Sequence, residues 1–142
     1  MKCLNWTALI MTITRRLTLL SLVGCLPLLG LLGGCTQVQV APNTLGEYKM
    51  GELQVVTETG FAATYDAVKQ GMKDASLFQT GDDRQPTQAE FKGRDSADTQ
   101  VIIKLKELGP NRTDVRIRYG IPGNLALAQQ VYQSIQKNLK SR

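Results

Sequence analysis

The sequence predicts an α+β fold in which an antiparallel sheet of about four strands and two helices form a two-layer sandwich, with both helices on one face. Three observations support this class. Residues 61–76 and 124–140 carry apolar side chains at helical spacing, and residues 99–118 alternate apolar and polar side chains around a turn. Each strand candidate has one apolar face, which a layer of helices must cover. The order is strand, helix, strands, helix.

The first part of the chain, residues 1–34, has the layout of a secretory signal peptide. Arg15 and Arg16 precede a leucine-rich run that ends in two glycines before Cys35. The sequence Leu32-Gly33-Gly34-Cys35 resembles the bacterial lipobox, in which the cysteine sulfur receives a diacylglycerol before the leader is cleaved. This resemblance implies a lipidated Cys35. Two or three acyl chains would attach the protein stably, because each buried methylene contributes about 0.8 kcal/mol.

Other interpretations of the leader stay open. A second lipobox match ends at Cys25, but it follows a shorter apolar run and precedes a hydrophobic stretch. An uncleaved anchor over 17–34 would be near the lower end of the ~17–25 residues that span a bilayer. A plain cleaved signal and a twin-arginine signal are further alternatives. Translation could begin at Met1 or Met11.

Cleavage before Cys35 would leave residues 35–142, enough for one domain. We expect a polar tether over 35–46, where the alternation over 37–40 leaves a short strand as the alternative, and a single α+β domain over 47–142. The leader holds three basic and no acidic residues, so its removal lowers the net charge from +5 to +2. This near-neutral charge argues against a nucleic-acid partner. With no free thiol left after lipidation, no disulfide is expected.

The first half of the domain predicts a strand over 47–57 and a helix over 61–76. Gly51 would weaken the strand or mark a bulge. Thr57 or Thr59 could cap the helix. Gly71 costs roughly 1 kcal/mol relative to alanine in a helix, and a close approach to the sheet would explain it. The apolar stripe of the helix consists of Phe61, Tyr65, Val68, Met72 and Ala75.

The second half predicts short strands, a hairpin and a closing helix. Residues 77–80 are an ambiguous strand, 81–86 a loop and 88–92 a half-buried strand. The hairpin over 99–118 turns at 108–112, and Asn124 caps a helix that runs to about Lys140. The hairpin register that joins both apolar faces pairs Ile103 with Ile117, Leu105 with Val115, Lys104 with Arg116, and Lys106 with Asp114.

Several of these features together resemble an uncharacterised family of small bacterial lipoproteins. They are the lipobox, a Tyr-x-x-Gly-x-Leu motif that begins at Tyr48, an alanine-rich first helix, the strand 113–120, and a helix that starts after Gly123. The chain departs from the family pattern at Tyr119, where valine is expected, and at Asn124, where aspartate is expected. Because the family has no established activity, the resemblance implies fold and location only.

The sequence offers few residues that could form a catalytic or metal site. The chain has no histidine, which excludes histidine-based triads, and no cofactor motif is present. Asp82 and Asp83, with Asp95 or Asp98, could hold a hard cation, but their spacing fits a solvated turn better. We expect no cofactor and no enzymatic activity. The candidate anion-binding face consists of Lys104, Lys106, Arg116 and Arg118.

These features predict a lipid-anchored envelope protein that acts as a non-enzymatic structural or binding module. The protein would attach to the membrane through lipidated Cys35. Its basic sheet face would bind an anionic lipid, a glycan or an envelope protein. In a Gram-negative host, the expected location is the periplasmic side of the outer membrane. One alternative is an adaptor on a larger envelope complex. The other is a cell-wall glycan enzyme that uses Asp82, Asp83 and Glu90.

Overall fold

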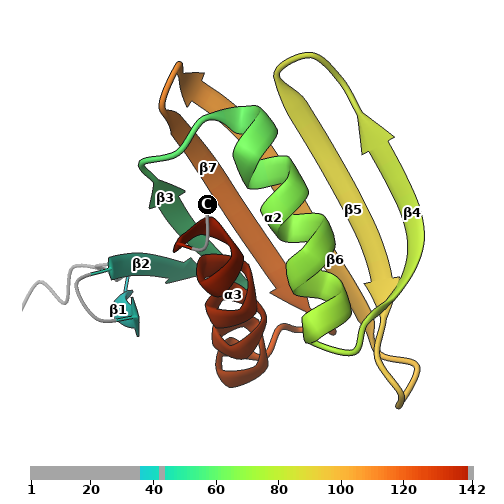
Figure 1. The fold of residues 1–142 in the computed structure, drawn as a ribbon. Coiled ribbons are helices and arrows are strands. Elements are labelled where there is room, and N and C mark those ends of the chain that lie inside the picture. Colours follow the sequence, from blue (N-terminus) through green and yellow to red (C-terminus); the bar gives the residue numbers. More distant parts are fainter. Residues whose placement is uncertain (1–35, 42–43, 141–142) are drawn as a thin grey trace, which may run out of the picture. The chain divides into compact units, whose positions relative to one another are not determined.

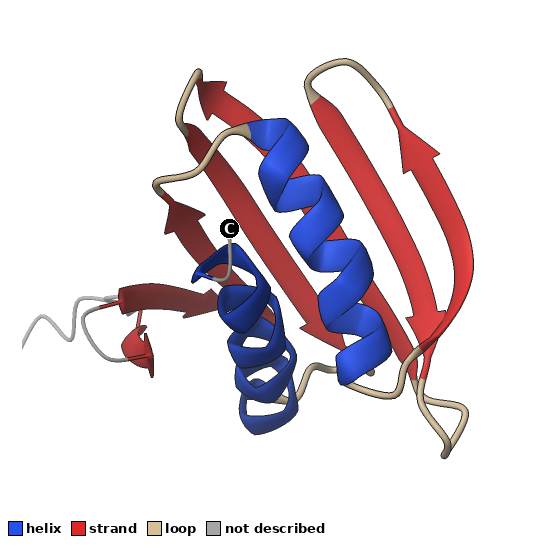
Figure 2. Cartoon of the chain, viewed as in Figure 1, coloured by secondary structure: helices blue, strands red, loops and turns tan. Residues whose placement is uncertain are grey.

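A computed structural model describes residues 36–41 and 44–140, all within the compact unit Gly34–Arg142. Every strand joins one antiparallel sheet, in the order β1-β2-β3-β7-β6-β5-β4 (Figures 1 and 2). The elements are β1 (Thr36–Ala41), β2 (Thr44–Lys49), β3 (Glu52–Thr57), α2 (Phe61–Asp74), β4 (Phe78–Arg84), β5 (Gln88–Arg94), β6 (Gln100–Gly109), β7 (Arg112–Tyr119) and α3 (Leu125–Lys140).

The prediction of a four-stranded, two-layer sandwich is wrong, because the sheet has seven strands. One extra strand arises within 47–57, which the turn at Met50 and Gly51 divides into the end of β2 and all of β3. Both turn residues have positive φ, at 51° and 81°, which reverses the chain tightly. An alternating pattern interrupted by glycine therefore marks two paired strands here rather than one bulged strand.

A further strand, β1, occupies part of the segment 35–46, where we expected a polar tether. Its backbone pairs with β2, and Val40 is almost fully buried. The amide groups of Gln129 and Gln133 on α3 donate hydrogen bonds to the carbonyl oxygens of Gln39 and Val40, at 3.2 and 3.5 Å. Polar side chains far along the chain thus hold this segment against α3.

The edge strand β4 covers most of the segment 81–86, which the sequence pattern assigned to a loop. Its polar residues find partners on α2. The Tyr65 hydroxyl donates to the Asp82 carboxylate, 2.7 Å from Oδ2, and the Arg84 guanidinium lies 4.3 Å from the centre of the Tyr65 ring. Hydrophobic periodicity does not detect such a strand, because polar contacts stabilise it.

The hairpin register predicted for 99–118 is confirmed at all four pairings. Its apolar face joins those of β3 and β5 in a core that contains Leu53, Val55, Phe91, Ile103, Leu105, Val115 and Ile117. Helix α2 contacts β4, β6 and β7, while α3 contacts β1, β3 and β7, and the two helices lie side by side (Figure 1). The polar side chains of β5, β6 and β7 point to the opposite face of the sheet.

The helix ends differ from the prediction at α2 and agree with it at α3. Helix α2 has Gly60 at its N-cap without a side-chain hydrogen bond, so neither Thr57 nor Thr59 caps it. Instead, the Thr57 hydroxyl donates to the Thr113 carbonyl oxygen, at 3.2 Å. The predicted cap of α3 is confirmed, because the Leu127 N–H donates to Asn124 Oδ1, at 3.1 Å.

Candidate functional site

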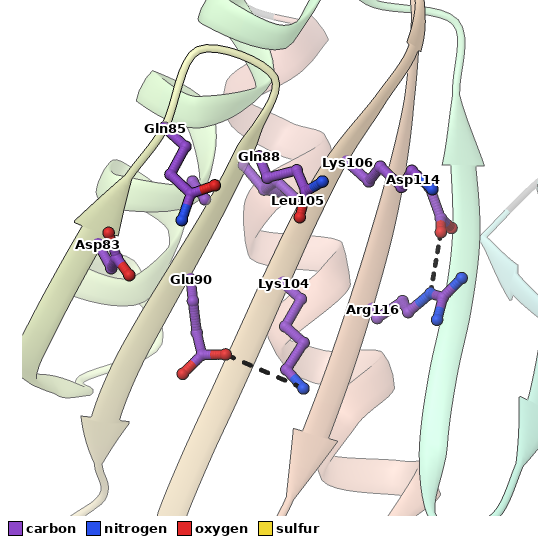
Figure 3. A pocket seen from close by; sticks show the side chains of 10 residues that line it. Asp83, Gln85, Gln88, Glu90, Lys104, Leu105, Lys106, Asp114 and Arg116 are labelled. Atoms are coloured by element: carbon purple, nitrogen blue, oxygen red, sulfur yellow. Dashed lines mark hydrogen bonds and ion pairs between the residues drawn. The ribbon is translucent and has the colours of Figure 1, made fainter.

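The four predicted cations lie on the polar face of the sheet, but the structure does not gather all of them. Lys104, Lys106 and Arg116 line one open groove of about 270 Å³, which we call the outer groove (Figure 3). Arg118 is not among its lining residues, although it lies two residues after Arg116 on β7. The groove is lined by Asp83, Gln85, Gln88, Ala89, Glu90, Lys104, Leu105, Lys106, Asp114 and Arg116.

Register explains how four strands and the turn between β4 and β5 build the outer groove. Glu90 on β5 pairs with Lys104 on β6, which pairs with Arg116 on β7. One rung further, Gln88 pairs with Lys106, and Lys106 pairs with Asp114. Because side chains alternate between the two faces of a sheet, both rungs point away from the helices.

The outer groove is less basic than the sequence suggested, because carboxylates lie among its cations. Arg116 Nε donates to Asp114 Oδ2 at 2.9 Å, and Lys104 Nζ lies 3.9 Å from Glu90 Oε2. These acidic partners offset the repulsion between Lys104 and Arg116, which are directly opposite each other. Outside the groove, Arg118 is similarly paired with Glu52, at 3.0 Å. The face is therefore a mixed-charge surface.

Asp114 is the residue of the groove whose importance the sequence analysis missed. Its side chain is only 3% exposed, and Oδ1 has no hydrogen-bond partner among the described residues. An unsatisfied carboxylate oxygen at such a depth costs about 1–3 kcal/mol or more, and native structures rarely tolerate it without a reason. The sequence signal is an aspartate between Thr113 and Val115 inside a strand, where a charged side chain must face solvent or find a partner.

Lys106 is the complementary feature. It faces Asp114 across the β6–β7 ladder, yet it forms no ion pair with any residue that the structure describes. The groove thus holds one cation and one carboxylate oxygen whose bonding capacity is unused. Together they could accept a ligand that carries both an acidic group and a hydrogen-bond donor.

Of the three carboxylates that might have formed a catalytic site, Asp82 lies apart from Asp83 and Glu90. Asp82 points toward α2, where it accepts from Tyr65, whereas Asp83 and Glu90 are paired on the outer face. Burial, and then the bond to Asp82, raises the pKa of the Tyr65 hydroxyl. Within 36–41 and 44–140, no group of three aspartate, glutamate, cysteine or histidine residues could hold a metal ion.

Asp95, the other proposed cation ligand, is used in a turn. Its Oδ1 accepts from the backbone N–H groups of Ala97 and Thr99, and its Oδ2 accepts from the Tyr119 hydroxyl, at 2.6 Å. These bonds, with the one from Tyr119 foremost, lower the pKa of Asp95. The same contact shows how tyrosine replaces the valine expected at this position: its hydroxyl has found a partner.

Cys35 lies outside the described residues, so its predicted lipidation stays a prediction. Neither helix in the described part of the chain is long and apolar enough to cross a membrane.

Comparison with known proteins gives one result. A family model described as "Protein of unknown function (DUF3568)" matches residues 7–138. No curated protein matches the chain.

Proposed function

The chain belongs to the DUF3568 family of proteins of unknown function, and from the layout of residues 1–35 and the geometry of the outer groove we propose that it is a lipid-anchored, non-enzymatic binding module of the bacterial cell envelope. The anchor would be Cys35, and in a Gram-negative host the domain would lie on the periplasmic side of the outer membrane. The layout of residues 1–35 supports this location.

The binding site that we propose is the outer groove, and its ligand is a polar envelope component with an acidic group and a hydrogen-bond donor. One observation carries this proposal. Asp114 Oδ1 is buried without a partner among the described residues, directly across the ladder from Lys106, which has no ion pair there. An acidic saccharide combines the two complementary groups, because its carboxylate or phosphate would meet Lys106, and a hydroxyl would donate to Asp114 once the side chains that cover Oδ1 move aside.

The ion pairs of Glu90 support binding rather than glycan hydrolysis. A glycosidase needs two carboxyl groups on either side of one scissile bond. Asp82 is turned to the helix side by Tyr65, which leaves Asp83 and Glu90 on the outer face. Glu90 is already occupied by Lys92, at 3.1 Å, and by Lys104. In this proposal, the acidic residues of the face serve to balance charge and select the ligand.

The anchor is tested by the intact mass of protein purified from membranes of the native host. We expect a polypeptide that begins at Cys35 and carries the additional mass of acyl chains. The variant Cys35→Ser should retain its leader and gain no lipid. A native polypeptide that begins upstream of Cys35, or whose Cys35 is unmodified, would contradict the anchor.

The groove is tested by NMR titration of the protein with four probes: glucuronate, glucose 1-phosphate, glucose and inorganic phosphate. The first two combine an acid with hydroxyl donors, so they should shift the groove resonances at lower concentration than the last two. Lys106→Gln and Asp114→Asn should each weaken binding by about tenfold, since a hydrogen bond to a charged group contributes roughly 1.5–3 kcal/mol.

The matched control for this titration is Lys49→Gln, which removes an exposed lysine on β2 outside the groove. It should leave the affinity unchanged. Equal weakening by Lys106→Gln and Lys49→Gln, with no weakening by Asp114→Asn, would show that general charge, rather than the groove, holds the probes.

A further inference from the structure

The most exposed large apolar side chains of the described residues are Ile121, Met50 and Phe78, at 91%, 84% and 70% exposure. All three lie where strands meet at one end of the sheet. Met50 follows the end of β2, Ile121 follows the end of β7, and Phe78 begins β4. Phe78 is on the edge strand β4, apart from the other two, so Met50 and Ile121 are the pair that could form one apolar patch.

Two of these residues belong to turns that touch. The turn that contains Met50 continues into Gly51, and the turn that contains Ile121 continues through Pro122 to Gly123. A Cβ added at Gly51 would lie 1.8 Å from the Pro122 carbonyl oxygen, and one added at Gly123 would lie 2.3 Å from the Gly51 carbonyl oxygen. Only glycine permits this approach, so the two glycines hold Met50 and Ile121 in one apolar tip.

The same end of the sheet receives the chain from its leader. Thr36, the first residue of β1, pairs with Tyr48, which lies two residues before Met50. Cys35 immediately precedes Thr36, and consecutive Cα atoms are only about 3.8 Å apart. Thr36, the residue that follows the proposed lipid attachment at Cys35, therefore lies at the same end of the sheet as the tip.

We propose that the apolar tip, Met50 and Ile121, inserts into the surface of the membrane that holds the lipid on Cys35. This inference rests on the anchor in the proposed function, and it adds a second contact that orients the domain. The two side chains are exposed in the protein alone and would be buried among lipid in the docked state. Lys49, exposed beside Met50, would meet the phosphate groups at the same depth.

The proposed orientation has a consequence for the outer groove. Asp114 precedes Tyr119, the last residue of β7, by five residues, and a strand rises about 3.3 Å per residue, so roughly 17 Å separates Asp114 from the end of β7 beside the tip. With the tip in the membrane, the groove would be held away from the headgroups of the anchoring membrane. Its ligand would then come from the compartment that the domain faces.

The experiment uses single-tryptophan variants of the full chain, purified from membranes and reconstituted into phosphatidylcholine–phosphatidylglycerol vesicles with brominated acyl chains. Trp6, the only tryptophan of the sequence, lies in the leader that would be cleaved before Cys35, so the lipidated protein has no native tryptophan. Met50→Trp, Ile121→Trp and Leu108→Trp are then made singly. Leu108 is the matched control, because it is an exposed apolar residue in the hairpin turn at the opposite end of β6.

We expect bromine to quench tryptophan at 50 and 121 at least twofold more than tryptophan at 108, with a blue-shifted emission at the first two positions. Equal quenching at all three positions in protein that floats with the vesicles would overturn the docking while leaving the anchor intact. Failure of the protein to float would overturn both. The sugar titration of the groove is independent of either outcome, because it uses no membrane.

Discussion

Lys106 and Asp114 occupy directly paired positions on β6 and β7, yet Asp114 takes its hydrogen bond from Arg116, two residues along its own strand. The cation and the carboxylate that the ladder brings together therefore do not neutralise each other. Asp114 keeps one buried oxygen without a partner, and Lys106 keeps its charge. Lys106 and Asp114 Oδ1 are the groups that we propose contact the ligand, whereas Arg116 and Asp114 Oδ2 form the ion pair that stabilises the strand.

The different roles of the two cations can be measured by denaturation. Arg116→Met removes the hydrogen-bond donor to a buried carboxylate, so we expect the free energy of unfolding to fall by about 1–3 kcal/mol. Lys106→Met removes a charge without an ion pair and should change it by less than about 0.5 kcal/mol. Urea unfolding followed by circular dichroism provides both values. A larger loss for Lys106→Met would show that this lysine already stabilises Asp114.

Gly71→Ala distinguishes helix propensity from packing. In an exposed helix, this change would stabilise the protein by about 1 kcal/mol. Here the new Cβ would lie 2.9 Å from the backbone N and Cα atoms of Ile135 on α3, so we expect a destabilisation of about 1–3 kcal/mol instead. The control is Gly109→Ala, which meets no atom within 4 Å. A rise in melting temperature for Gly71→Ala would refute this close contact between helices.

The cap of α3 predicts the effect of two substitutions at one position. Asn124→Ala removes the acceptor of the Leu127 N–H and should lower the free energy of unfolding by about 1 kcal/mol. Asn124→Asp keeps an acceptor oxygen and adds a negative charge at the positive end of the helix dipole, so it should preserve or slightly raise stability. Thermal unfolding of the native protein and the two variants at neutral pH measures both effects.

Tyr119→Phe should raise the pKa of Asp95 toward its ordinary value of 3.8, because the Tyr119 hydroxyl is the main hydrogen-bond donor that lowers it. A lowered pKa means that Asp95 stabilises the fold above its unfolded pKa, and that this contribution is lost as the pH falls through the folded pKa. The variant should therefore lose less stability on acidification. Carboxyl NMR titration measures the pKa directly.

The control for this titration is Tyr132→Phe, which removes a buried hydroxyl elsewhere in the core. It should leave the pKa of Asp95 unchanged. Burial, followed by the bond to Asp95, raises the pKa of Tyr119 to about 12, so the tyrosine remains a neutral donor throughout the acidic range of the experiment. An unaltered Asp95 in Tyr119→Phe would mean that the turn amides alone set its pKa.

Hydrophobic alternation was sufficient to predict the β6–β7 hairpin and its register, because only one pairing parity places Ile103 and Ile117 on the same buried face. Helical spacing was sufficient for α2 and α3, since each buries a continuous stripe. The same reasoning failed for β1 and β4. Their stability comes from partners distant in sequence, such as Gln129 for Gln39 and Tyr65 for Asp82, and no local pattern records such pairs.

The candidate site divides in the same way. The sequence by itself determined that Lys104, Lys106 and Arg116 share the polar face, because period-two alternation assigns each strand residue to a face. Only the tertiary structure decided which of these cations are neutralised, that Asp114 is buried with one oxygen unsatisfied, and that the turns that carry Met50 and Ile121 touch through Gly51 and Gly123. Such relationships depend on distances of a few ångströms between strands and turns, and these distances are set when the whole sheet assembles.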